Sequence, residues 1–272
     1  MAATARITLA GAGALITGAT GGIGRAIARE LGGRGARLIL TGRRAEELAQ
    51  LQDELRARTI ACDLADRGEV ERLGEAAVAA PVDILVANAA LPASGLLVDL
   101  SPAEIDRMLD VNLRAPIALA RALAPGMIDR GRGHMVFISS LSGKAATPAA
   151  SLYSATKFGL RGFALGLRED LRRCGIGVSV VTPGFISDAG MYARAGVKLP
   201  PGAGTKTPQQ VADAVVRAIE RNRAELDVAP LPLRVGAAIG SVAPGLAAWG
   251  SRVMGSDRIA AEFAERQRGE RS

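Results

Sequence analysis

A glycine-rich turn between an apolar strand and a helix is the feature that most constrains how this chain folds. Residues 14–17 read ALIT and predict a buried strand, GATGGIG follows at 18–24, and residues 25–31 predict a helix. Gly18 permits a tight turn, Gly22 lets backbone approach a pyrophosphate, and Gly24 lets the helix pack closely on the strand. The helix N-terminus offers free N–H groups to phosphates. The pattern predicts a nucleotide-binding element, with a plain packing turn as the alternative in a chain of 33 glycines.

Strands and helices alternate after this turn. Apolar runs predict strands at 37–41, 59–62, 83–87, 134–139, 177–182 and 225–229. Helical patterns predict helices at 45–56, at 70–80, after the cap Ser101 with Pro102 and Glu104, and from Pro208 to 221. The alternation predicts an α/β fold, a Rossmann-type doubly wound parallel sheet with helices on both faces. We expect one domain over residues 1–230 and a C-terminal extension over 231–272.

Tyr153 and Lys157 stand one helical turn apart, so both side chains project from one face of a predicted helix. An ammonium beside a phenol favours the phenolate and lowers the pKa of the phenol. This spacing predicts a tyrosine that exchanges a proton near neutral pH.

With that pair and the glycine turn, the chain resembles the classical short-chain dehydrogenase/reductase family from about Gly11 to about Pro230. The matching segments are Thr17–Gly24, Asp63-Leu64, Asn88 within Ala87–Ala90, Asn112, Ser140 and Pro183-Gly184. The resemblance implies hydride transfer between a nicotinamide dinucleotide and a carbonyl or alcohol, coupled to proton transfer.

The resemblance also implies a role for each catalytic residue. Ser140 would hold the substrate oxygen, and Tyr153 would deliver or remove the proton. Lys157 would lower the pKa of Tyr153 and hold the ribose hydroxyls, while Asn112 would steady a relay water. The cofactor-binding positions would be Gly18, Thr20, Gly22, Ile23, Gly24, Arg43, Asp63, Leu64, Asn88, Tyr153, Lys157, Pro183, Gly184 and Ile186.

The end of the strand at 37–41 bears on the choice of cofactor. It is followed by Gly42, Arg43 and Arg44, with no acid to hold a ribose 2′-hydroxyl. Arg43 is suited to a 2′-phosphate, and Arg44 to a solvated charge at the start of a helix. We therefore expect NADP(H) to be favoured, with NAD(H) as the alternative.

Three positions depart from the family pattern. Ala87 and Ala90 replace an Asn and a Gly of the fourth-strand segment, and Asp188 stands where a Thr is usual. An ionised Asp accepts hydrogen bonds but does not donate them, so the hydroxyl contact at Asp188 is in doubt.

The substrate is specified only as a class. Its walls are expected at Leu91–Leu97, Leu141–Ala150 and Phe185–Lys206, where Leu91, Leu141, Phe185 and Met191 lie among small residues. They indicate an apolar ketone or secondary alcohol. Four glycines at 190–204 suit a lid that orders on binding, or equally a surface loop.

Composition excludes several classes of protein. Two cysteines indicate a reducing compartment, and no targeting or membrane-spanning segment is apparent, so we expect a cytoplasmic protein. The net charge of +7 is spread out and aromatics are 3%, which argues against nucleic-acid binding. A single histidine and no cysteine cluster argue against a metal site. The family resemblance implies a homodimer or homotetramer.

Two other functions remain as alternatives. A catalytically silent dinucleotide-binding regulator would not need the set Asn112, Ser140, Tyr153 and Lys157. A sugar-nucleotide epimerase or dehydratase would need a larger C-terminal domain.

The uncharged segment 235–250 is expected to pack near the cleft or on another subunit, and a peripheral membrane contact is the alternative.

Overall fold

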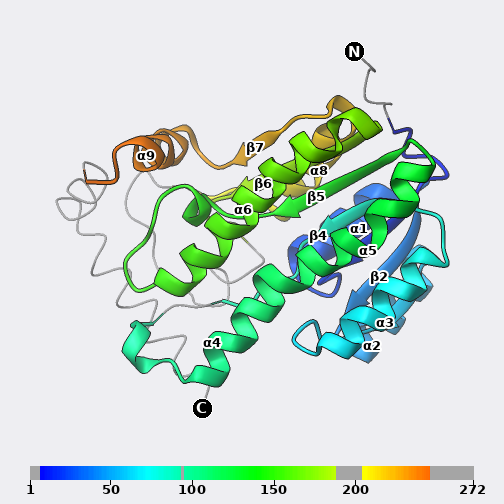
Figure 1. The fold of residues 1–272 in the computed structure, drawn as a ribbon, viewed down its shortest axis with the longest axis horizontal. Helices are drawn as coiled ribbons and strands as arrows, with labels where there is room; N and C mark the ends of the chain where they lie inside the picture. The colour runs from blue at the N-terminus through cyan, green and yellow to red at the C-terminus, as the bar shows by residue number, and fades with distance from the viewer. Residues whose placement is uncertain (1–6, 93–94, 188–203, 246–272) are drawn as a thin grey trace.

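The computed structural model describes residues 7–92, 95–187 and 204–245 (Figure 1). Its centre is a seven-stranded parallel sheet with the order β3-β2-β1-β4-β5-β6-β7. Its strands are β1 (Gly13–Thr17), β2 (Arg37–Gly42), β3 (Arg58–Ala61), β4 (Val82–Ala87), β5 (Gly133–Ile138), β6 (Ile176–Pro183) and β7 (Glu225–Val228). The doubly wound parallel sheet predicted from the alternating pattern is confirmed.

Helices cover both faces of this sheet (Figure 1). They are α1 (Gly22–Gly33), α2 (Ala45–Leu55), α3 (Arg67–Val78), α4 (Pro102–Leu109), α5 (Ala115–Asp129), α6 (Ser151–Leu171), α8 (Pro208–Arg221) and α9 (Leu231–Val242). Short 3₁₀ segments are η1 (Leu97–Asp99), η3 (Leu141–Gly143) and η4 (Arg172–Cys174), and η2 (Asp110–Arg114) is a π-helical turn.

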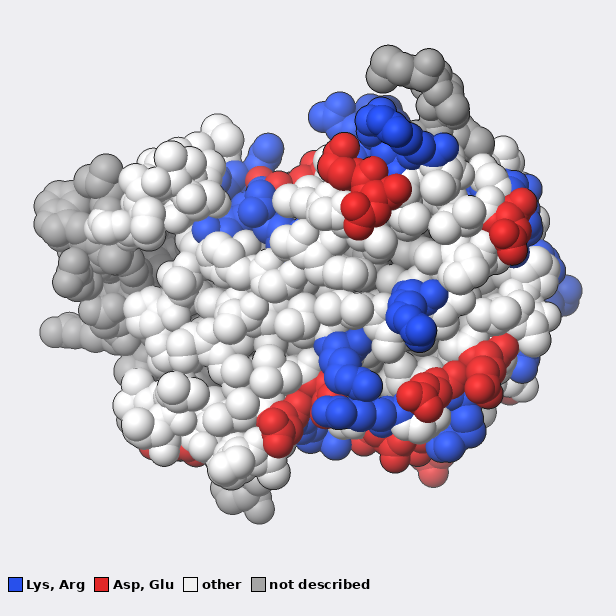
Figure 2. Space-filling view, viewed as in Figure 1, with Lys and Arg blue, Asp and Glu red and all other residues white. Residues whose placement is uncertain are grey.

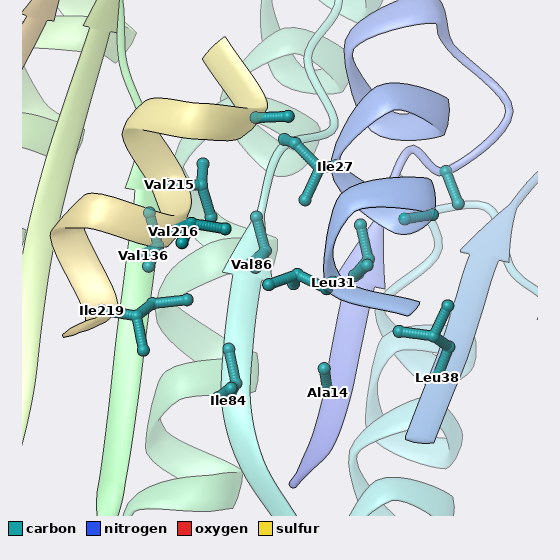
Figure 3. Close-up of a cluster of buried hydrophobic side chains, with 14 of the residues drawn as sticks. Ala14, Ile27, Leu31, Leu38, Ile84, Val86, Val136, Val215, Val216 and Ile219 are labelled. Atoms are coloured by element: carbon teal, nitrogen blue, oxygen red, sulfur yellow. The ribbon is translucent and has the colours of Figure 1, made fainter. Parts of the chain in front are cut away.

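Two hydrophobic clusters hold the layers together, one on each face of the sheet. On one face, α1, α2 and α8 pack on alternate residues of the strands. Figure 3 shows Ile27 and Leu31 of α1 near Val86 of β4, and Ile219 of α8 beside Val136 of β5. On the other face, α3, α5 and α6 cover the intervening residues, such as Leu85 and Phe137. The inner strands are therefore buried on both sides, as parallel strands usually are.

Helix caps place two helices as the sequence predicts. The Ser101 hydroxyl accepts the Glu104 N–H, and the Glu104 carboxylate accepts the Ser101 N–H, which completes a capping box at α4. Thr207 and Gln210 form the same motif at α8. The order of strands reverses between β1 and β4, so their carboxyl ends open on a crevice where ligands of this fold bind.

The described part of the C-terminal extension is α9, which ends two residues before Pro244. Its small residues Ala237 and Gly240 are buried, while Leu231, Val235, Ile239 and Val242 are exposed. The Ser241 hydroxyl donates to the carbonyl of Lys144, beside η3, at 3.1 Å. Within the described residues, no helix combines the length and the apolar character that crossing a bilayer requires.

Candidate active site

The glycine turn after β1 has no room for side chains at two of its positions. Gly18 has a φ of +65°, and a Cβ there would lie 2.8 Å from the Cα of Ala89. A Cβ on Gly24 would lie 2.1 Å from the carbonyl oxygen of Gly18. The turn therefore requires glycine for its backbone conformation at Gly18, and for the close packing of α1 on the strand at Gly24.

The first turn of α1 suits an anionic group. Gly21 caps it without a side-chain hydrogen bond, and no acidic residue lies in the first turn. A helix start of this kind leaves N–H groups and the positive end of the dipole for a ligand. These residues fit the pyrophosphate of a dinucleotide.

Asn88, at the end of β4, supports this turn. Its side-chain amide donates to the carbonyls of Thr17 and Gly18 at 3.0 and 3.2 Å, and its N–H donates to the Thr17 hydroxyl at 3.0 Å. The family resemblance implies that Asn88 contacts the cofactor. In the structure the amide nitrogen of Asn88 is hydrogen-bonded to the turn. The side chain therefore supports the backbone that would contact the phosphates.

The two arginines after β2 have different surroundings. Arg44 donates to the carbonyl of Thr20 at 2.8 Å and pairs with Glu47 at 2.7 Å, so it joins the glycine turn to α2. The expectation that Arg44 is merely a solvated charge is therefore incomplete. Arg43 is exposed and makes no hydrogen bond or ion pair among the described residues, which leaves its guanidinium available to a ligand.

Asp63 follows β3 and meets an arginine that the sequence patterns do not reveal. Its carboxylate accepts Arg107 of α4 at 2.8 Å and the Ala65 N–H at 3.0 Å. Burial alone would raise the pKa of Asp63, but these bonds and the charges of Arg107 and Arg43 outweigh burial and lower the pKa. Leu64 beside it is buried. The residue after β3 is therefore an ionised acid that pairs with Arg107 and also feels the charge of Arg43.

Ser140, Tyr153 and Lys157 come together where β5 ends and α6 begins. The Ser140 hydroxyl accepts the Ser142 N–H at 3.1 Å and hydrogen-bonds with the Tyr153 phenol. The Lys157 ammonium is buried, donates to the carbonyl of Ile138 at 2.9 Å, and lies 5.7 Å from the centre of the Tyr153 ring. The structure thus brings together the three side chains expected to do the chemistry.

The pKa values of this group differ from the sequence-based expectation. Burial raises the pKa of Tyr153 to about 12, and the hydrogen bond with Ser140 opposes the rise only in part. Burial also lowers the pKa of Lys157 to about 8. Each shift has the same cause, because removing water penalises the charged form of either group. Tyr153 is therefore a phenol that holds its proton at neutral pH, rather than one poised to lose it.

Asn112 is buried in the π-helical turn η2 and joins two parts of the site. Its amide oxygen accepts the Leu91 N–H at 2.7 Å, and its amide nitrogen donates to the Leu91 carbonyl at 3.0 Å. A longer contact of 3.4 Å reaches the Thr156 hydroxyl on α6. The side chain thus anchors the segment at Leu91 to α6, and its expected role in a water relay stays a prediction.

The turn after β6 closes the other side of the group. Gly184 donates its N–H to the carbonyl of Val228, and a Cβ on Gly184 would lie 3.3 Å from Leu141. Ile186 is buried, and it forms an isolated bridge with Lys206. Asp188, Met191 and the expected lid up to residue 203 lie outside the described residues.

Known proteins share this arrangement. A family model for short chain dehydrogenases matches residues 12–198, which include both the glycine turn and the Tyr153–Lys157 pair. The ketoacyl reductase HetN of a Nostoc species is 35% identical over 249 residues, which cover 87% of each chain.

Solved structures show the same fold. A short-chain dehydrogenase from Sphingobium yanoikuyae in complex with NADPH aligns with a TM-score of 0.74 at 30% identity, over 86% of this chain and 94% of its own. A variant of actinorhodin polyketide ketoreductase with NADPH aligns with a TM-score of 0.74 at 32% identity, over 80% and 96% of the two chains.

Proposed function

This chain is a member of the short-chain dehydrogenase family, and from that premise we propose that it reduces a ketone of an apolar small molecule to the alcohol, with NADPH as cofactor. The observation that carries this proposal is the convergence of Ser140, Tyr153 and Lys157 beside the carboxyl ends of the strands. A bound nicotinamide dinucleotide would supply the hydride at this edge. An aldehyde is the alternative substrate, and oxidation of the alcohol is the reverse reaction.

The proton chemistry of a reduction can be assigned to these residues. A carbonyl that gains a hydride also needs a proton on its oxygen, and Tyr153 holds one at neutral pH because burial raises its pKa to about 12. The Ser140 hydroxyl, which also acts on the pKa of the phenol, would donate to the same substrate oxygen and fix its position. The Lys157 ammonium would stabilise the negative charge that Tyr153 acquires as it gives up the proton.

NADP(H) fits the residues around β2 better than NAD(H). No acid ends this strand, and the guanidinium of Arg43 makes no hydrogen bond or ion pair among the described residues, whereas that of Arg44 is occupied. A guanidinium binds a phosphate through paired charge-assisted hydrogen bonds. Three solved structures that the chain resembles contain NADP or NADPH, which supports the same choice.

Two kinds of observation support the proposed substrate class. Leu91, whose backbone Asn112 anchors, and Leu141, which directly follows Ser140, are the apolar residues that we expect to line the substrate site. A ketoacyl reductase and a polyketide ketoreductase are among the similar proteins, and both names describe ketone reduction. We therefore assign a ketone on an apolar body as the substrate.

A panel of ketones tests the proposal. Purified protein with NADPH would be given cyclohexanone, acetophenone and acetoacetyl-coenzyme A, and nicotinamide absorbance would be followed. We expect oxidation of NADPH with at least one of them, and formation of the matching alcohol. Tight binding of NADPH with no turnover on a broad panel would contradict the proposal, and would favour the silent regulatory protein.

A further inference from the structure

The turn after Ser140 ends in a lysine that is nearly buried. Lys144 follows η3, and its side chain is 11% exposed. The ammonium donates to Asp227 of β7 at 2.5 Å and lies 3.3 Å from Glu225. Glu225 has a second cation, Arg161, at 2.7 Å. The charge of Lys144 is therefore matched chiefly by Asp227, which also lies 4.0 Å from Arg234.

Asp227 of β7 also forms a hydrogen bond with β6, the neighbouring strand. Its carboxylate accepts the hydroxyl of Thr182, the residue before Pro183 in β6. A single carboxylate thus joins Lys144, four residues after Ser140, to the end of β6, where Pro183-Gly184 forms the other side of the catalytic group. The two partners of the pair lie 83 positions apart in the chain.

Close packing at the same junction leaves the turn little freedom. A Cβ on Gly143 would lie 2.5 Å from the Ser139 hydroxyl and 2.7 Å from the carbonyl of Lys157. A Cβ on Gly184 would lie 2.9 Å from the Cβ of Ala229 and 3.3 Å from Leu141. The turn is held against α6 on one side and against the ends of β6 and β7 on the other.

We propose that Lys144 and Asp227 form a positioning pair that holds the Ser140 hydroxyl in register with Tyr153 and with the turn at Pro183-Gly184. The inference rests on the proposed function, because it assigns a part in that chemistry. Neither residue contacts the reacting atoms, and both act through the turn. Removing one partner leaves a poorly solvated charge with only a more distant partner, Glu225 for Lys144 or Arg234 for Asp227, so the backbone must move to improve the pairing. A displacement of about 1 Å at a catalytic group costs about 100-fold in rate.

Paired variants test this assignment. Lys144→Met keeps the aliphatic stem and removes the charge, and Asp227→Asn keeps the shape and removes the charge. With the ketone from the panel that the parent reduces fastest, we expect each variant to lower kcat by about 10- to 100-fold. The Kd for NADPH, measured by nicotinamide fluorescence, should change little. The double variant should lose no more than the more severe single variant, and Lys144→Arg should recover most of the lost kcat.

Arg132→Met is the matched control for stability. It breaks the ion pair between Arg132 and the buried Asp83, whose closest contact is 3.0 Å, at the amino ends of the strands. It should lower the free energy of unfolding without changing kcat. If Lys144→Met loses comparable stability but keeps the parent kcat, the pair is only structural and the inference is overturned. Independent, multiplying losses in the two single variants would also overturn it.

A Tyr153→Phe arm separates this inference from the proposed function. If the parent has no turnover, or if Tyr153→Phe keeps it, the proposed function fails and the inference fails with it. If Tyr153→Phe loses turnover while Lys144→Met and Asp227→Asn keep it, the proposed function stands and only the positioning pair is overturned. Should Lys144→Met not fold, Asp227→Asn alone gives the same decision.

Discussion

Burial acts on Tyr153 and Lys157 in opposite directions. It raises the pKa of the phenol to about 12 and lowers the pKa of the ammonium to about 8, since each group is disfavoured in its charged form. At neutral pH the protein therefore presents a protonated tyrosine beside a lysine that is close to its titration point. The charge of Lys157, rather than that of Tyr153, is the one that ordinary changes of pH alter.

Cofactor affinity should follow this lysine. Protonated Lys157 would hold the ribose hydroxyls, and the free protein loses that charge as pH rises through about 8. We expect the Kd for NADPH to increase above about pH 8, and Lys157→Met to weaken binding and flatten the dependence. Fluorescence titrations across this range check it. An equally steep rise of Kd in Lys157→Met would assign the effect to another group.

Arg43 should distinguish the two dinucleotides. We expect NADPH to bind more tightly than NADH, and Arg43→Ala to remove most of that difference, a loss of about tenfold or more for a charged hydrogen bond. Arg44→Ala is the control, because Arg44 supports the turn at Thr20 and should weaken both cofactors alike. Equal affinities of the parent for NADPH and NADH would contradict the role of Arg43.

At the scale of helices and strands, periodicity predicts which elements exist better than where they begin. The sequence pattern starts a helix at residue 70, whereas α3 starts at Arg67 because the Asp66 carboxylate accepts the Glu69 N–H. That cap has a sequence signal, an acid followed three residues later by Glu. α5 is apolar on most sides and contains Pro125, so it has little periodicity to detect, and it is absent from the predictions.

The π-helical turn at Asn112 and the contacts of Asp63 and Lys144 have no local signal. Arg107 lies 44 positions from Asp63, and Asp227 lies 83 positions from Lys144. Such pairs arise only when the sheet brings strand ends together. Short sequence motifs therefore predict the candidate catalytic residues, but not the residues that hold them in place.

The contact between β5 and β6 should make stability depend on pH. Buried His134 lies 2.8 Å from the Ser179 hydroxyl, and burial lowers the pKa of His134 to about 3. Below about pH 6.5 His134 is protonated in the unfolded chain but stays neutral in the folded protein, so the free energy of unfolding decreases as pH falls.

We expect urea unfolding to show this loss between about pH 7 and pH 5. The parent should lose roughly 2 kcal/mol more than His134→Gln, which keeps a hydrogen-bonding amide without the titration. Groups common to both proteins cancel in the difference. Equal losses in the two proteins would show that His134 does not carry the effect.

For the molecule as a whole, the parallel topology explains why motifs far apart in sequence form one site. The glycine turn, Asn88, Ser140 and Pro183-Gly184 each lie at or directly after the carboxyl end of a strand, and all strands run the same way. The net charge of +7 does not collect into one patch on the face drawn in Figure 2, where basic and acidic side chains are interleaved. Helix α9 of the C-terminal extension also contacts the turn that follows Ser140, because the Ser241 hydroxyl donates to the carbonyl of Lys144.

The central claim is that Tyr153 supplies the proton for ketone reduction, and Tyr153→Phe tests it most directly. This substitution keeps the ring over Lys157 and removes only the hydroxyl. With saturating NADPH and a ketone that the parent reduces, we predict that kcat falls by about 100-fold or more, the scale of general acid catalysis, while the Kd for NADPH stays close to that of the parent. A Tyr153→Phe protein that reduces the ketone at the parent rate would contradict the account.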